Sequence, residues 1–247
     1  MIYADPGDSF AEWREAARGL LARGVRPDEV VWSGGGQAGL FGNAAADDDA
    51  APCGTFRVPA EFLKLARAVA CYESVERWGL LYRLLYRIAG GRRHLLEIES
   101  DEDMRCARLM EKAVNRDVHK FHAFVRFREI EVEGEKVFAA WHEPQHFTVE
   151  KAVPFFVRRF GDMRFSIFTP KLCAHWDLEE LKFSPGVERV ALADDTTEDF
   201  WLTYYRAIFN PFRLKVGAMK KEMPVRHWRT LPEARLINEL IEEAGRV

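Results

Sequence analysis

The sequence predicts an α+β fold, in which an antiparallel sheet built around a β-hairpin is flanked by N-terminal and C-terminal helices. Apolar residues at helical spacing fall mainly into two blocks, one before residue 115 and one after residue 195. Between the blocks, short runs rich in aromatic and β-branched residues indicate strands. Helices grouped around a strand-rich middle are typical of α+β proteins.

The first predicted elements are a short strand at 1–4, a helix from Asp8 to about Arg23, and a second short strand at 29–32. Apolar side chains three or four residues apart define the helix: Phe10, Trp13, Ala17, Leu20 and Leu21. A stretch rich in glycine, alanine and aspartate at about 34–54 is predicted to be a flexible loop. We expect residues 1–247 to form a single domain that contains this loop.

Three further helices are predicted before the sheet. One begins near Pro59, and a second covers about 74–89. The third opens at Ser100-Asp101-Glu102-Asp103, which resembles a capping signal, and extends to about Val114.

The sheet is predicted to begin with a hairpin whose arms are 119–128 and 137–141, joined by a turn at Gly134. Apolar residues from Val149 to Phe160 have helical spacing. Pro154 lies within that stretch, and because proline disrupts a helix interior, we expect the helix to begin only there.

Two more strands are predicted at 164–169 and 172–176, around a turn at Thr169-Pro170-Lys171. The C-terminal third is predicted to be helical. Capping boxes at 196–199 and 230–233 precede its two apolar stripes.

The run from His119 to Arg128 combines cations and aromatic rings at strand spacing. Successive strand side chains point to opposite faces, so one face would carry His122, Phe124, Arg126 and Arg128. Guanidinium groups bind phosphates and aromatic rings stack on bases. We therefore predict a nucleic-acid surface here, with His119 and Lys120 beside it.

The formal net charge of −3 excludes a uniformly basic DNA-coating protein. The charge is unevenly distributed: 177–199 carries eight acids and two bases, whereas 206–235 carries eight bases and two acids. In the basic stretch, Lys215, Lys220, Lys221 and Arg226 are candidates for phosphate contacts, and Trp228 for stacking or core packing. Alternatively, both stretches are simply solvated surfaces.

The four cysteines contain no Cys-x-x-Cys pair, which fits a reducing compartment and gives no zinc-ribbon or iron–sulfur signature. No apolar run approaches the roughly 20 residues that span a bilayer, and the N-terminus does not resemble a secretory signal. We expect a cytoplasmic protein without a cofactor. Residues 34–39 match G-x-G-x-x-G, but no helix is predicted to open there, so we interpret them as loop.

Histidines offer the clearest candidates for catalysis. His122, His142, Glu143 and His175 would meet at one edge of the sheet if the predicted strands pair, and could act as general acids or bases. A metal site is not predicted, because the spacing matches no ligand pattern and His-x-x-His on a strand separates its two rings. Phosphate contacts and buried structural histidines remain the alternatives.

The 119–128 run is followed by several further motifs in order: Trp141-His142-Glu143-Pro144-Gln145-His146, Pro154-Phe155-Phe156-Val157-Arg158-Arg159-Phe160, Ser166-Ile167-Phe168-Thr169-Pro170, Ala174-His175-Trp176-Asp177, Asp199-Phe200-Trp201 and Glu222-Met223-Pro224. In these motifs the chain resembles a bacterial family known as probable DNA metabolism proteins.

This resemblance implies a role in DNA repair. Members of the family occur beside a radical S-adenosylmethionine (radical-SAM) DNA repair protein, and some are fused N-terminally to a uracil-DNA glycosylase-like domain. No catalytic residues carry over, and this chain has neither the cysteine motif of a radical enzyme nor the glycosylase motifs.

Together these observations predict a DNA-repair accessory domain that binds DNA and works with a glycosylase-like partner, a radical-SAM partner, or both. Two alternatives remain. The protein could be a DNA-processing enzyme that uses the histidine and glutamate candidates, or a protein-interaction scaffold whose acidic 177–199 stretch binds a basic partner.

Overall fold

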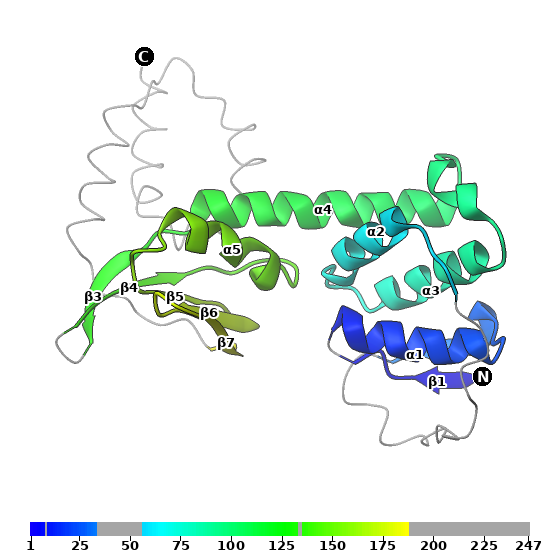
Figure 1. The fold of residues 1–247 in the computed structure, drawn as a ribbon, viewed down its shortest axis with the longest axis horizontal. Coiled ribbons are helices and arrows are strands. Elements are labelled where there is room, and N and C mark those ends of the chain that lie inside the picture. Colours follow the sequence, from blue (N-terminus) through cyan, green and yellow to red (C-terminus); the bar gives the residue numbers. More distant parts are fainter. Residues whose placement is uncertain (8, 34–55, 133–134, 188–247) are drawn as a thin grey trace, which may run out of the picture. The chain divides into compact units, whose positions relative to one another are not determined.

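The computed structural model describes residues 1–7, 9–33, 56–132 and 135–187, and these residues form an α+β protein, as predicted (Figure 1). The chain divides into two compact units, 1–116 and 117–247, with the boundary inside one long helix. The prediction of a single domain remains a prediction. The loop at 34–54 and the C-terminal helices lie outside the described residues.

The N-terminal unit opens with a small parallel pair of strands, β1 (Ile2–Ala4) and β2 (Val30–Trp32), linked through helix α1 (Phe10–Ala22). Ser9 caps α1 because its hydroxyl accepts from the Glu12 amide while the Glu12 carboxylate accepts from the Ser9 amide. A short 3-10 helix, η1 (Pro27–Glu29), leads into β2. These elements confirm the predicted strand–helix–strand order.

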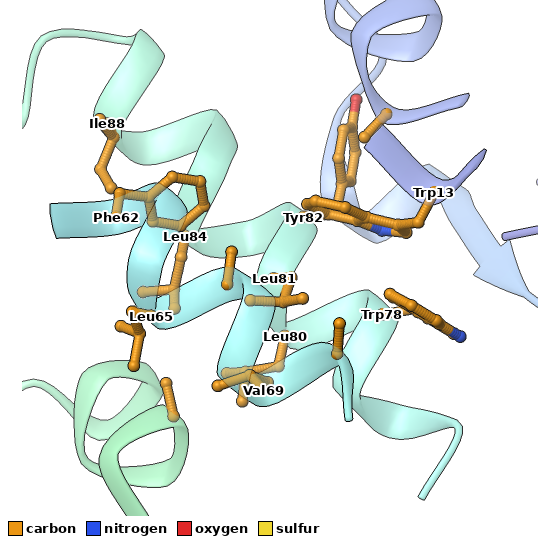
Figure 2. Packing of buried hydrophobic residues seen from close by; sticks show 14 of the residues in the cluster. Trp13, Phe62, Leu65, Val69, Trp78, Leu80, Leu81, Tyr82, Leu84 and Ile88 are labelled. Atoms are coloured by element: carbon orange, nitrogen blue, oxygen red, sulfur yellow. The ribbon is translucent and has the colours of Figure 1, made fainter. Parts of the chain in front are cut away.

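Helices α2 (Ala60–Ala70) and α3 (Glu76–Ala89) pack against each other and against α1, and Figure 2 shows their buried residues together with Trp13 of α1. The centre of this core is aromatic, with Trp13 stacked on Trp78 at a ring-centroid distance of 5.9 Å. Tyr82 is also buried and donates its hydroxyl to the Val25 carbonyl at 2.8 Å. The helical spacing read from the sequence correctly predicted the buried Trp13, Ala17, Leu20 and Leu21 of α1, whereas Tyr82 was not predicted.

A 3-10 helix, η3 (Arg93–Glu97), connects α3 to α4 (Glu102–Phe124). Asp101 caps α4 by accepting from the Met104 amide, and it also forms an ion pair with Arg87 on α3. Arg87 pairs with Asp103 as well, so the start of α4 is fastened to α3. The predicted capping signal is confirmed, but the helix continues about ten residues beyond its predicted end at Val114.

The C-terminal unit contains a five-stranded sheet in the order β3-β4-β5-β6-β7. The strands are β3 (Arg128–Val132), β4 (Glu135–Trp141), β5 (Phe165–Phe168), β6 (Leu172–Trp176) and β7 (Leu181–Pro185). All neighbours are antiparallel except β4 and β5, which are parallel and joined through helix α5 (Val149–Arg159). The second arm of the hairpin (β4) and the two following strands were predicted, whereas β3 begins only at the last residue of the predicted first arm and β7 was not predicted.

Helix α5 packs on one face of this sheet (Figure 1). The shared core comes from α4, α5 and alternate strand residues, including Phe121, Val153, Phe156, Phe165 and Ile167. The expectation that this helix begins at Pro154 was wrong, since it begins at Val149. Proline costs one backbone hydrogen bond there, and the four buried residues Val149, Ala152, Val153 and Phe156 compensate for that loss.

The strand predicted at 119–128 was also wrong, because α4 extends to Phe124 and β3 starts only at Arg128. Phe121 and Val125 are buried four residues apart, which is helical spacing. The alternation of cations and rings in this run matches a strand by coincidence, and tertiary burial of the helical stripe overrides it.

Candidate nucleic-acid interface

One side of α5 is exposed and combines cations with an aromatic ring. Lys151, Phe155 and Arg158 are all exposed, and their spacing of three and four residues places them on the same side of the helix. The opposite side, with Val149, Ala152, Val153 and Phe156, is buried. The same amphipathic pattern that anchors α5 on the sheet therefore presents these three residues to solvent.

Phe155 is held in place by His122 of α4. The two rings are stacked, with centroids 4.3 Å apart and planes at 25°. The His122 Nε2 lies 3.0 Å from the Ala152 carbonyl oxygen. Since a carbonyl only accepts, Nε2 carries the hydrogen and donates it. This bond sets the orientation of the imidazole, which in turn supports the phenylalanine ring.

The pKa of His122 is lowered from its usual value, mainly because burial disfavours the charged imidazolium. His119 and Arg158 lower it further by charge repulsion, whereas the hydrogen bond to the Ala152 carbonyl opposes the shift. His122 is therefore neutral at pH 7. It acts there as an aromatic support rather than as a fixed cation.

The loop before α5 presents a second exposed ring, Phe147. The buried carboxylate of Asp117 holds this loop: it accepts from the Gln145 amide and the His146 amide at 3.1 Å each, and from the Thr148 hydroxyl at 2.8 Å. Two of these bonds hold backbone amides before Phe147, and the third holds the side chain of Thr148 after it.

The Lys171 ammonium lies 4.5 Å from the centroid of the Phe147 ring, within cation–π range. It also donates to the Gln145 carbonyl at 3.3 Å, which holds it near the loop. We call Phe147, Lys151, Phe155, Arg158 and Lys171 the aromatic–basic surface.

The shared face predicted for His122, Phe124, Arg126 and Arg128 assumed a strand. His122 and Phe124 instead lie in α4, where two positions along the helix turn about 200° rather than return to the same side. His119 is exposed, Lys120 is buried, and His122 supports Phe155. Phe124 and Arg128 are half-buried, and Arg126 donates to the Ala123 and Val125 carbonyls at 2.6 and 3.2 Å near the end of α4. The remaining candidates lie outside the described residues: Lys215, Lys220, Lys221, Arg226 and Trp228.

The residues predicted as catalytic candidates contact different parts of the protein. His142 is 0% exposed and packs against Phe121, with ring centroids 4.5 Å apart. Glu143 is half-buried in the following loop. His122 contacts α5, as described above. Their catalytic role remains a prediction.

His175 lies between two serines on the sheet face opposite α5. Its Nδ1 is 2.9 Å from the Ser166 hydroxyl, and its Nε2 is 2.9 Å from the Ser184 hydroxyl. A neutral imidazole has one N–H and one acceptor nitrogen, so one serine donates to the ring and the other accepts. Burial lowers the pKa of His175, which favours this neutral form. The three side chains link β5, β6 and β7.

Within the described part of the chain, no group of three or more His, Cys, Asp or Glu residues is arranged to hold a metal ion. Among the same residues, no helix has the length and apolar character needed to cross a membrane.

The model of a family described as a domain of unknown function, DUF4130, matches residues 75–233. The chain belongs to this family. No curated protein and no solved structure matches the chain. The DUF4130 match includes α3, α4, the sheet and α5, so the whole aromatic–basic surface lies within the family domain.

Several residues of this DUF4130 surface were not singled out by the sequence analysis, namely Phe147, Lys151, Phe155, Arg158, Lys171 and the supporting Asp117. The spacing of Lys151, Phe155 and Arg158 was visible in the sequence and would have placed them together on a helix. The contribution of Asp117 was not visible, because its partners lie about thirty positions further along the chain.

Proposed function

We propose that this protein is a DNA-repair accessory domain that binds DNA through the aromatic–basic surface. The observation that carries the proposal is the pairing of exposed rings with cations along α5 and its preceding loop. Phe147 lies beside Lys171, and Phe155 lies on the same helix face as Lys151 and Arg158. Lysine and arginine neutralise phosphates, and exposed rings accept bases by stacking.

The resemblance to probable DNA metabolism proteins supports the repair role and its partners. In this proposal, a uracil-DNA glycosylase-like domain, a radical-SAM protein, or both supply the chemistry, and this domain holds the DNA. The predicted basic zone of 206–235 would add phosphate contacts.

The test is fluorescence-anisotropy binding of the full chain to labelled single-stranded, duplex and uracil-containing DNA across a salt series. Lys151→Ala combined with Arg158→Ala should weaken binding at least about tenfold, because one charge-assisted contact contributes about 1.5 kcal/mol or more. The slope of log affinity against log salt should become shallower by about 1.4 to 1.8, since each lost phosphate contact removes about 0.7 to 0.9.

Lys64→Ala combined with Arg92→Ala is the matched control. Both side chains are exposed in the N-terminal unit, and the double variant removes the same charges. Equal losses of DNA affinity in the two double variants would show that binding depends on general charge attraction, and would contradict the proposed surface. Absence of binding at low salt would favour the scaffold alternative.

A further inference from the structure

The two exposed rings of the aromatic–basic surface are held rigidly by groups that lie beneath or beside them. Phe155 is 37% exposed although one of its faces is stacked on His122. Phe156 meets it edge-on at a centroid distance of 5.3 Å, and the His122 imidazole is held by the Ala152 carbonyl. The ring therefore has little freedom to lose when a flat ligand stacks on its accessible surface.

The position of the Phe147 ring is also restricted by its neighbours. Phe147 is 44% exposed, and its neighbours are held by Asp117 through the amides of Gln145 and His146 and the side chain of Thr148. Lys171 lies over the ring and carries a positive charge next to it. A base that stacks at this ring would bring its phosphate near the ammonium group.

We propose that the aromatic–basic surface selects unpaired nucleotides, so that its preferred ligand is single-stranded DNA. This inference rests on the proposed function and adds the substrate class. In a duplex, the faces of the bases are covered by their neighbours, and only base edges are accessible in the grooves. A phenylalanine ring has no group that reads those edges. In a single strand, the base faces are available for stacking.

The order of these residues along the chain fits a strand of several nucleotides. Phe147 lies in the loop before α5, and Phe155 lies on α5 eight residues later. Lys151 lies between the two rings in the sequence, and Arg158 follows the second. Cations thus alternate with rings, as a chain of alternating bases and phosphates requires.

The same alternation argues against a protein partner at this surface. The cores of protein interfaces are enriched in aromatic residues but depleted in lysine. Here Lys151 and Lys171 accompany both rings, and Lys171 lies directly over one of them. Burial of these ammonium groups in an apolar interface would be unfavourable without matching acids.

The test compares four ligands of equal length and label: a mixed-sequence single strand, a thymine single strand, the duplex, and a single strand with abasic sites at alternate positions. The abasic strand keeps every phosphate and lacks half of the bases, so it separates stacking from charge attraction. We expect the full chain to bind both intact strands similarly and more tightly than the duplex. Each base stacked on phenylalanine should contribute about 5- to 150-fold.

Phe155→Leu and Phe147→Leu keep an apolar side chain but remove the flat ring. Each should reduce the preference for intact over abasic strand at least about fivefold, while the salt dependence stays unchanged. Phe183→Leu is the matched control, because Phe183 is 40% exposed on β7, away from α5 in the sequence. Circular dichroism of each variant checks that it is folded.

The outcomes separate this inference from the proposed function. Salt-dependent binding with equal affinity for intact, abasic and duplex DNA would overturn the preference for unpaired nucleotides and leave DNA binding intact. Tighter binding to the duplex, or an unchanged preference in both folded phenylalanine variants, would also overturn it. Absence of binding to all four ligands would overturn both.

Discussion

Asp117 is the residue whose replacement should most directly loosen the C-terminal unit. Its side chain is 3% exposed and accepts three hydrogen bonds. One carboxylate oxygen, Oδ1, accepts from the Gln145 amide, and the other, Oδ2, accepts from the His146 amide and the Thr148 hydroxyl. We therefore choose Asp117→Asn and Asp117→Ala as the perturbations.

The expected change in the free energy of unfolding follows from the number of hydrogen-bond donors that lose their acceptor. The asparagine carbonyl can replace Oδ2 and keep two bonds, but its NH2 group then faces the Gln145 amide. We expect Asp117→Asn to lower the free energy of unfolding by about 1.5 to 3 kcal/mol, the usual contribution of one bond to a charged group. Asp117→Ala should lower it by about 3 to 5 kcal/mol, because three donors are left but their losses overlap.

Two measurements check this prediction on the full chain. Urea unfolding gives the change in free energy, and hydrogen exchange of the Gln145 and His146 amides reports the loop directly. Exchange of the Gln145 amide should speed up at least tenfold in Asp117→Asn, and exchange of both amides in Asp117→Ala, since about 1.4 kcal/mol corresponds to a factor of ten. Asp162→Asn, at an exposed carboxylate after α5, is the control and should change neither quantity.

The reasoning would be refuted by an Asp117→Ala variant whose unfolding free energy stays within about 0.5 kcal/mol of wild type, the range typical of surface substitutions. Unchanged exchange at both amides would refute it as well. In either case the three hydrogen bonds would not be what holds the Phe147 loop.

Two further predictions concern titratable groups that are buried or half-buried. Burial raises the pKa of Tyr82 to about 12, and its hydroxyl donates to the Val25 carbonyl; Tyr82→Phe should lower the free energy of unfolding by about 1 to 2 kcal/mol in urea titrations, and no loss would mean that this bond is not formed. Burial lowers the pKa values of His175 and His122, so the unfolded state takes up protons first as the pH falls. Stability that is present above about pH 6.5 should therefore decrease below it. His175→Gln should make this fall smaller without abolishing it, because His122 contributes with the same sign, and an identical pH profile in unfolding experiments would contradict the role given to His175.

Local sequence patterns predicted the N-terminal unit well. The stripe of α1 and the capping signal at Asp101 both correspond to observed features. These features depend on residues close together in the chain, so spacing and capping chemistry are sufficient to predict them. Strands β5 and β6 were predicted for the same reason.

The 119–128 run shows where local pattern fails. Its alternation of cations and rings fits a strand. However, Phe121 and Val125 are buried in the core formed with α5 and the sheet, and this burial makes the first half of the run helical. Pro154 shows the same effect, since burial on both sides of it keeps α5 intact. In both cases contacts with distant residues outweigh a local preference of a few kcal/mol at most.

The sequence by itself determined the α+β class, most element positions and the association of cations with aromatic residues in this part of the chain, because these properties depend on composition and short-range spacing. Only the tertiary structure decided which rings are exposed and what supports them. His122 reaches Phe155 across thirty-three residues, and Asp117 reaches the Phe147 loop across about thirty. These contacts form because α4 and α5 pack on the sheet. Residues that are close together in the sequence do not predict that packing.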